Sequence, residues 1–205
     1  MARRSILQFK NYRRRVLTGA DNSSSNCDVF INHRGIDTKR NVAGLLHNNL
    51  SRLNVRSFLD RESMRPGDNL FEKINNAIRN CRVGVTIFSP NYCNSYFCLH
   101  ELALIMECKK KVIPIFYDVK PSELRVLDGN GQRSPDELWR FRCALDEARY
   151  TVGITFDSIN GNWSDLMTNA TDIILKTLDE EEHIYQQEQL GAVPPKNTTD
   201  HTNNI

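Results

Sequence analysis

The stretch VGVTIFSPNYCNSYFCLHELALIMECKKKVIPIF, residues 83–116, decides the fold class of this chain. It opens with an apolar run of β-branched and aromatic residues, Val83 to Phe88, and closes with a second run, Val112 to Phe116. Between the two runs, apolar residues recur at helical spacing at Leu99, Leu102, Ala103 and Met106. Short, nearly unbroken apolar runs are typical of parallel strands that are buried on both faces. The stretch therefore predicts a strand, a helix and a second, parallel strand.

The same alternation continues toward the N-terminus. Two more apolar runs, Val29 to Ile31 and Val55 to Leu59, predict strands. Apolar faces predict one helix through Leu45, Leu46, Leu50 and Leu53, and another through Leu70, Ile74, Ala77 and Ile78. Two further helices are expected around residues 137–149 and 164–178. Right-handed helical crossovers between parallel strands predict an α/β fold, a flavodoxin-like sheet with helices on both faces.

In such sheets a ligand binds beyond the carboxyl ends of the strands. The loops after Ile31, Leu59, Phe88 and Phe116 are therefore the expected site of function.

The two ends of the chain differ from this core in composition. Residues 1–26 are predicted to form a basic and polar disordered tail, residues 27–180 the folded domain, and residues 181–205 a polar C-terminal tail. Six basic residues precede the first acidic one, Asp21: Arg3, Arg4, Lys10, Arg13, Arg14 and Arg15. A solvated tail, a contact to phosphates or a membrane surface, and a transit peptide are alternative interpretations of this stretch.

Composition narrows the class of protein further. With 205 residues, 40% hydrophobic and 25% charged, the chain suits one globular domain with tails. Its net charge of +2 favours no particular partner, and no apolar run approaches the roughly 18 residues of a membrane span. Its six cysteines form no C-x-x-C pair and no zinc-ligand spacing with histidines, so no metal is expected. Reduced cysteines in apolar segments predict a cytoplasmic protein, with a nucleocytoplasmic distribution as the variant.

Four segments resemble plant-type Toll/interleukin-1 receptor (TIR) domains in order and spacing. They share apolar strands followed by short polar motifs, and they are Cys27 to Thr38, Ser57 to Asp68, Ile87 to Leu102 and Val112 to Ser122. The resemblance covers about residues 27–125 and implies a TIR fold without an attached nucleotide-binding ATPase or repeat domain.

Members of this family assemble signalling complexes, split NAD+ at the nicotinamide–ribose bond, or do both. The resemblance implies a catalytic carboxylate at Glu101. It also implies a nucleotide crevice that includes Arg34, Gly35, Asp60, Arg65, Ser89, Ser95 and Phe97. NAD+ would be a substrate rather than a cofactor, and the products would be nicotinamide with ADP-ribose or cyclic or nucleotide-derived signals. The expected partners are further copies of the chain and other TIR proteins, and the alternative function is a non-catalytic TIR–TIR adaptor in defence signalling.

The residue types suit this chemistry. The pyridinium of NAD+ leaves as a neutral molecule, so the reaction needs no general acid, unlike a two-carboxylate glycosidase. One carboxylate at Glu101 can stabilise the developing oxocarbenium ion. Gly35 permits close approach of the backbone to a ligand, and Arg34 suits an anionic group. The ring of Phe97 can stack on a flat heterocycle.

Each of these residues also has a purely structural interpretation. Glu101 falls outside the apolar stripe of its helix and suits a solvated glutamate near a helix start. The alternatives for the others are a surface ion pair for Arg34, a turn for Gly35, caps or turns for Ser89 and Ser95, and a core anchor for Phe97.

The chain departs from the family pattern at several positions. Ile36, Phe97 and His100 stand where the family usually has Glu, Trp and Asp, and His100 would add positive charge below a pH of about 6.5. Gly44-Leu45 replaces a Ser-His pair used for self-association, and the short stretch after Gly129 predicts the loss of one peripheral helix. Nucleic-acid binding rests on the N-terminal charge run alone and is the least supported hypothesis.

Overall fold

The computed structural model describes residues 27–59, 69–128 and 133–191, with the side chains of residues 189–191 left out. The predicted tail at residues 1–26 and the last part of the chain, from residue 192, lie outside the described residues. In the described part of the chain, no helix combines the length and the apolar character that a membrane span requires.

Within the described residues, five strands form one wholly parallel sheet in the order β2-β1-β3-β4-β5. The strands are β1 (Val29–His33), β2 (Ser57–Phe58), β3 (Val83–Phe88), β4 (Lys111–Tyr117) and β5 (Ile154–Phe156). This is the strand order of flavodoxin-like sheets. The predicted fold class is therefore confirmed.

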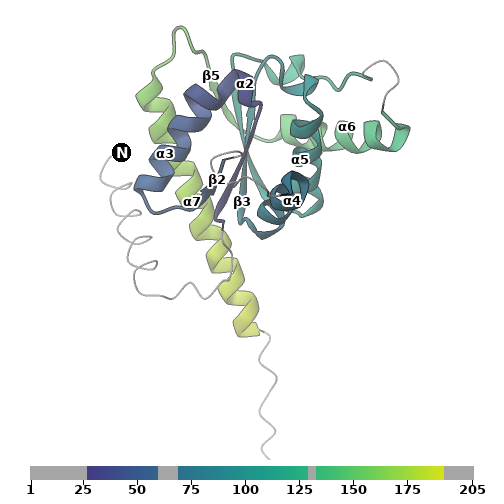
Figure 1. Ribbon diagram of the computed structural model, residues 1–205. Coiled ribbons are helices and arrows are strands. Elements are labelled where there is room, and N and C mark those ends of the chain that lie inside the picture. The colour runs from purple at the N-terminus through teal and green to yellow at the C-terminus, as the bar shows by residue number, and fades with distance from the viewer. Residues whose placement is uncertain (1–26, 60–68, 129–132, 192–205) are drawn as a thin grey trace, which may run out of the picture.

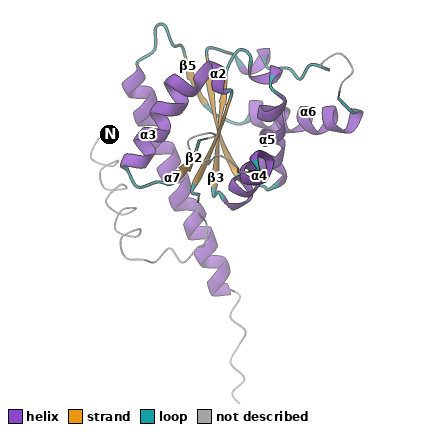
Figure 2. Cartoon of the chain, in the orientation of Figure 1, coloured by secondary structure: helices purple, strands orange, loops and turns teal. Residues whose placement is uncertain are grey.

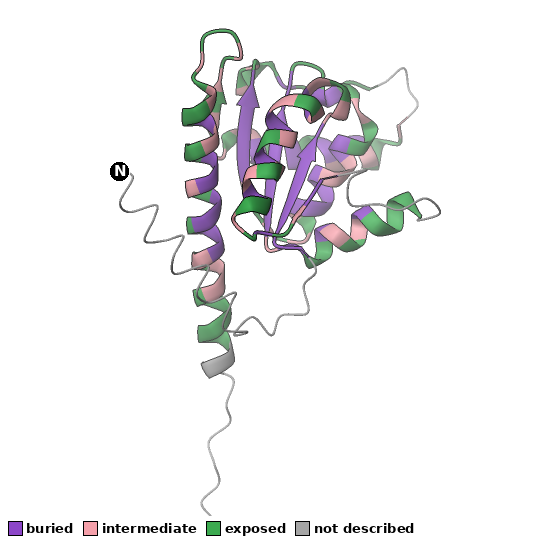
Figure 3. Cartoon of the chain, turned by 60° about the vertical axis from the view of Figure 1, so that its left-hand side comes forward, coloured by how far each residue is buried: buried purple, intermediate pink, exposed green. Residues whose placement is uncertain are grey.

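Helices cover both faces of this sheet (Figures 1 and 2). One face carries α3 (Gly44–Arg52) and α7 (Trp163–Gly191), and the other carries α4 (Leu70–Asn80), α5 (Tyr96–Glu107) and α6 (Pro135–Tyr150). Successive strand residues alternate between the two cores: Val29 and Ile31 pack toward α3 and α7, whereas Phe30 packs toward α4 and α5. The strands are buried throughout their central part (Figure 3), which explains the unbroken apolar runs in the sequence.

The register of the central strands determines which loops meet. Residues Val29 to His33 of β1 pair in order with Val83 to Ile87 of β3, so both strands end at the same level. The turn after β1, which contains the short helix α2 (Gly35–Thr38), therefore lies beside Ser89 at the end of β3. This is the edge of the sheet at which α5 begins, after the 3-10 turn η3 (Tyr92–Asn94).

Two elements differ from the sequence-based expectation. Strand β5 was not expected, because its three residues are only partly buried and form no apolar run. Helix α7 continues to Gly191, so residues 181–191 are helical where the sequence suggested a polar tail from residue 181. Arg82 accounts for part of this extension, since its guanidinium donates to the Leu178 carbonyl at 2.7 Å and pairs with Glu182 at 3.0 Å.

Polar contacts of this kind leave no apolar periodicity in the sequence.

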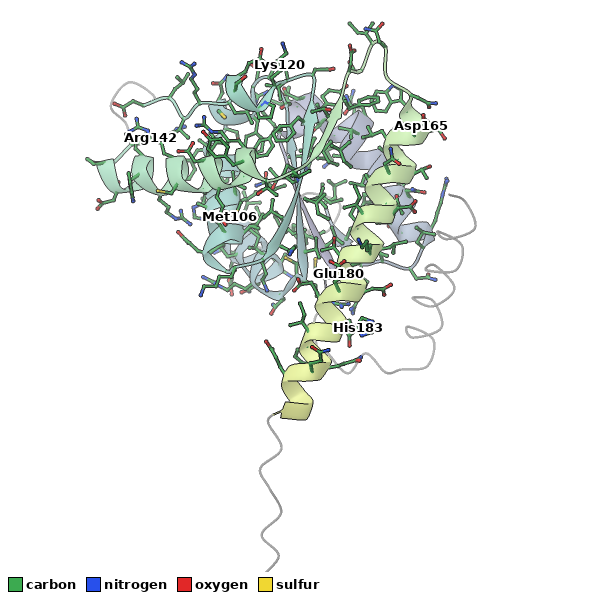
Figure 4. All side chains as sticks on the ribbon, turned by 180° about the vertical axis from the view of Figure 1, so that it is seen from behind. Met106, Lys120, Arg142, Asp165, Glu180 and His183 are labelled. Carbon is green, nitrogen blue, oxygen red and sulfur yellow. The ribbon has the colours of Figure 1, made fainter. Side chains whose placement is uncertain are left out.

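Seen from behind (Figure 4), α7 runs along the domain from Asp165 and reaches past the sheet at Glu180 and His183.

A kink before α3 explains the glycine at position 44. The π-helical segment η1 (Lys39–Ala43) precedes α3, and Asn41 within it has non-helical angles of φ −127° and ψ −109°. A Cβ atom at residue 44 would lie 2.5 Å from the Lys39 carbonyl oxygen. Serine, which the family pattern has here, does not fit this backbone. The next residue, Leu45, is exposed although the sequence suggested an apolar face, because Leu46 and Leu50 of α3 are the residues that face the sheet.

We expect Gly44→Ala to destabilise the domain by about 1–3 kcal/mol, the usual cost of forced overpacking. At an unobstructed helix position the same change stabilises by about 0.5–1 kcal/mol, so the sign of the effect tests the kink. Urea unfolding followed by circular dichroism measures it, with Asn48→Ala at an exposed site of α3 as the control. A more stable Gly44→Ala protein would contradict the close approach of residues 39 and 44.

Candidate functional site

A pocket of about 250 Å³ opens at the carboxyl end of β1, between α4 and α5. Four residues that the sequence analysis selected line it together: Gly35, Ser95, Phe97 and Glu101. They come from the turn after β1 and from the first two turns of α5. This is the crevice beyond the carboxyl ends of strands that open α/β sheets use for ligands.

Glu101 is half-buried in the wall of this pocket. It lies in the second turn of α5, so it is near the helix start, as its structural interpretation suggested, and it also lines the pocket. Helix α5 is buried along Cys98, Leu99 and residues 102–105 and has no single narrow apolar stripe. Phe97 and Glu101 are four residues apart, which places both side chains on the same face of the helix.

Gly35 needs no special backbone conformation in this structure. A Cβ atom built on it would have no atom within 4 Å, so the fold alone gives no reason for a glycine at this position. The open space beside it belongs to the pocket. A small residue here keeps the backbone of α2 accessible to a ligand.

Ser95 is both a helix cap and a residue that lines the pocket. It is the N-cap of α5, where its hydroxyl accepts a hydrogen bond from the Cys98 amide at 3.3 Å, and it also lines the pocket. Capping fixes the direction of the first turn of α5 and thereby the position of Phe97.

A buried polar network anchors this end of α5 to β1. The Asn32 amide donates to the Cys98 carbonyl at 3.0 Å, and the Tyr92 hydroxyl lies 2.9 Å from the same carbonyl and 3.1 Å from Asn32 Oδ1. Asn32 and Tyr92 are fully buried. Burial, followed by the nearby Cys98 and Glu101, raises the pKa of Tyr92 well above its ordinary value, so the phenol stays a donor. This network leaves no signal in the sequence, because Asn32 lies 60 or more residues from its partners Tyr92 and Cys98.

Arg34 and Ser89 do not line the pocket. The Arg34 guanidinium pairs with the Asp37 carboxylate, and the buried Ser89 hydroxyl donates to the other oxygen of Asp37 at 2.6 Å. Arg34 thus forms an ion pair, as its structural interpretation suggested, whereas Ser89 ties the end of β3 to the turn after β1 through Asp37. The other two predicted crevice residues, Asp60 and Arg65, lie outside the described residues.

Phe97 stands at the mouth of the pocket and is 42% exposed, so it is not a core anchor. The sequence analysis did not select the apolar residues that line the pocket with it, Phe58, Leu70 and Ile74 among them. Leu70 is the first residue of α4, and its position directly after the loop that follows β2 is the one clue that the sequence offered.

The contacts of His100 do not favour the charged form that the sequence suggested. Its Nδ1 atom accepts from Arg140 of α6 at 3.2 Å, and its Nε2 atom is buried without a hydrogen-bond partner in the described residues. Burial and the Arg140 charge lower the pKa of His100, and Glu107 and Glu137 oppose this only in part. His100 therefore gains a positive charge only at a lower pH than the value of about 6.5 that the sequence suggested.

No group of three or more His, Cys, Asp or Glu side chains in the described segments is arranged to hold a metal ion.

We expect Tyr92→Phe to lower the free energy of unfolding by about 1 kcal/mol, because the buried Cys98 carbonyl and Asn32 amide lose a neighbouring donor. Tyr96→Phe is the matched control. Its hydroxyl donates to Glu137 at an exposed site, where a loss below about 0.5 kcal/mol is usual. Equal losses of unfolding free energy in urea titrations of the two variants would show that the buried hydrogen bonds of Tyr92 stabilise the protein no more than the exposed one of Tyr96.

The lowered pKa of His100 predicts a pH dependence of stability. The unfolded imidazole takes up a proton near pH 6.5, whereas the folded one does so at lower pH, so the unfolded state binds more protons in between. The free energy of unfolding should fall as pH drops from 7.5 to 5.5, and His100→Gln should reduce this fall. His183→Gln, which removes an exposed imidazole of α7, should leave it unchanged. An identical pH slope in wild type and His100→Gln would refute the assignment.

Comparison with known proteins agrees with this architecture. A family model described as TIR domain matches residues 26–187. The protein named "Probable 2′ cyclic ADP-D-ribose synthase BdTIR" from Brachypodium distachyon is 47% identical over 182 residues, which span 87% of this chain and 81% of that protein. Disease resistance protein RUN1 from Vitis rotundifolia is 36% identical over 74% of this chain, although the match spans only 12% of RUN1.

Among solved structures, the TIR domains of the activated Roq1 resistosome, which directly recognises the pathogen effector XopQ, match with a TM-score of 0.65. The identity is 30%, and the match covers 72% of this chain and 99% of that one. The family model spans most of the chain, and a relative of similar length is nearly half identical. The chain therefore belongs to the TIR domain family.

Proposed function

We propose that this domain is an NAD+ nucleosidase that cleaves the bond between nicotinamide and ribose. The observation that carries the proposal is the half-buried carboxylate of Glu101, which shares a pocket with Gly35 and the exposed ring of Phe97. The name of the Brachypodium relative, a probable 2′ cyclic ADP-D-ribose synthase, supports the same substrate class. NAD+ is then consumed as a substrate and is not a resident cofactor.

The pocket suits the chemistry of this bond. Because nicotinamide departs as a neutral ring, the enzyme has to stabilise positive charge that moves onto the ribose, and a fixed carboxylate does this. Glu101 supplies the carboxylate, on a helix whose start is anchored to β1 by Asn32 and Tyr92. Phe97 offers an aromatic face to a flat ring, and Gly35 keeps the backbone open to the ribose or its phosphate.

The pocket also suggests that more than one copy takes part. A volume of about 250 Å³ is smaller than the roughly 300–1,000 Å³ of sites that enclose a drug-sized ligand. A dinucleotide would thus occupy it with one end and extend past the mouth. We infer that a second copy completes the site in a self-associated form, with residues Asp60 and Arg65 among those that contribute. The products are nicotinamide and ADP-ribose or a cyclic or nucleotide-derived signal in plant defence and cell death.

Glu101→Ala and Glu101→Gln should each lower the rate of nicotinamide release from NAD+ by about a hundredfold or more, as removal of an electrostatic stabiliser commonly does. The assay uses purified protein with a crowding agent, and light scattering reports the assembly state of each variant. Glu147→Gln, which neutralises an exposed glutamate of α6, serves as the control and should retain wild-type rates. Full activity of an assembled Glu101→Ala protein would remove this mechanism.

The second candidate is a non-catalytic TIR–TIR adaptor. It is favoured by two exposed apolar side chains, Ile36 of α2 at 88% exposure and Leu45 of α3 at 46%, which suit contact with another protein. An assembled wild-type protein without NAD+ turnover would decide for the adaptor, and robust turnover would exclude the purely non-catalytic version.

A further inference from the structure

A second aromatic ring, that of Phe71, contacts the ring of Phe97 at the pocket mouth. Phe71, the second residue of α4, packs against it with 5.3 Å between ring centroids and 35° between the ring planes. Phe71 is 43% exposed and Phe97 is 42% exposed, so both rings keep large apolar faces in contact with solvent. Phe71 does not line the pocket itself and reaches it only through Phe97.

Phe71 also contacts His100 of α5. The edge of one ring meets the face of the other at 90° between Phe71 and His100, with centroids 5.9 Å apart. Phe97 and His100 are three residues apart on α5, so they project from the same face of the helix and Phe71 contacts both.

His100 is held in turn by two neighbours. Arg140 donates to its Nδ1 atom, and Tyr96 stacks on its ring at 6.0 Å with 18° between the planes. Arg140 is itself fixed by a two-point contact to the Glu107 carboxylate. A chain of contacts thus runs from α6 through His100 and Phe71 to the ring at the pocket mouth.

An isolated, half-exposed phenylalanine would sample several rotamers at little cost. Contacts with Phe71 and with Tyr96, whose ring centroid lies 6.0 Å from that of Phe97, limit this freedom, and ring pairs at such distances attract each other beyond the effect of buried area. A ring that is already oriented loses less conformational entropy when it receives a flat ligand. The pair also offers more apolar area than one phenyl ring can.

We propose that Phe71 is a positioning residue of the candidate pocket, which fixes the ring of Phe97 so that its face receives a flat heteroaromatic ring of the substrate. This inference rests on the proposed cleavage of NAD+. Phe71 acts on substrate binding through Phe97 and takes no part in the bond-breaking step.

The test compares steady-state kinetics of nicotinamide release for wild type, Phe71→Ala and Phe71→Tyr at one protein concentration and a verified assembly state. Phe71→Ala should raise KM about two- to tenfold with little change in kcat, in line with the strength of an aromatic pair. Phe71→Tyr keeps the ring, and its hydroxyl can reach solvent, so it should restore the wild-type KM. Tyr150→Ala, at the far end of α6, controls for loss of an exposed aromatic side chain.

A second measurement separates binding from turnover. In a Glu101→Ala background, saturation-transfer NMR with NAD+ should show weaker binding after Phe71→Ala, by the same factor as the rise in KM. Turnover by wild type with an unchanged KM in Phe71→Ala would overturn the positioning role alone. Absence of both turnover and NAD+ binding in wild type would overturn the proposed function and this inference with it.

Discussion

The carbonyl of Cys98 is the point at which the sheet and the candidate site are joined. It receives hydrogen bonds inside the protein from Asn32 of β1 and from Tyr92 of the turn before α5. Without partners, the buried side chains of Asn32 and Tyr92 would each cost about 1–3 kcal/mol, so these hydrogen bonds favour the observed start of α5. Every pocket residue on α5 takes its position from that start, because a helix fixes the relative directions of its side chains. The buried network at the carboxyl end of β1 and the Ser95 cap therefore both contribute to the geometry of the site.

Helix α5 both fills part of the core and carries residues of the pocket. Its buried residues fill the core between the sheet, α4 and α6, while Phe97, His100 and Glu101 remain on the remaining face. Burial of Cys98, Leu99 and residues 102–105 holds the helix in the core, which suits a side chain whose charge has to be held in a fixed place. The turn after β1 is rigid for a different reason, since Asp37 links Arg34 and Ser89 there. Well-anchored elements thus border a small pocket on two sides, and the ring of Phe97 at its mouth packs against Phe71.

The sequence predicted the fold well where burial alone decides it. The apolar runs at Val83 to Phe88 and Val112 to Phe116 are strands buried on both faces, as expected for short apolar runs at this spacing. The sequence predicted the secondary structure less well where polar contacts determine it. Strand β5 and the last turns of α7 depend on backbone pairing and on Arg82, and neither leaves an apolar pattern. For the site, the resemblance to TIR domains selected Glu101, Gly35, Ser95 and Phe97, which line one pocket, but it also selected Ser89, which faces Asp37.

The sequence by itself determined the alternation of strands and helices and the sheet class, because these depend on the order of apolar and polar residues along the chain. The family followed from the resemblance of four short motif segments. Only the tertiary structure decided which polar side chains meet. Asn32, Tyr92 and Cys98 come together through strand register and a single helix start, and Phe71 meets Phe97 because α4 packs beside α5. The physical reason is that burial favours many residues independently, whereas a hydrogen bond or a ring contact requires two particular groups within a few ångströms.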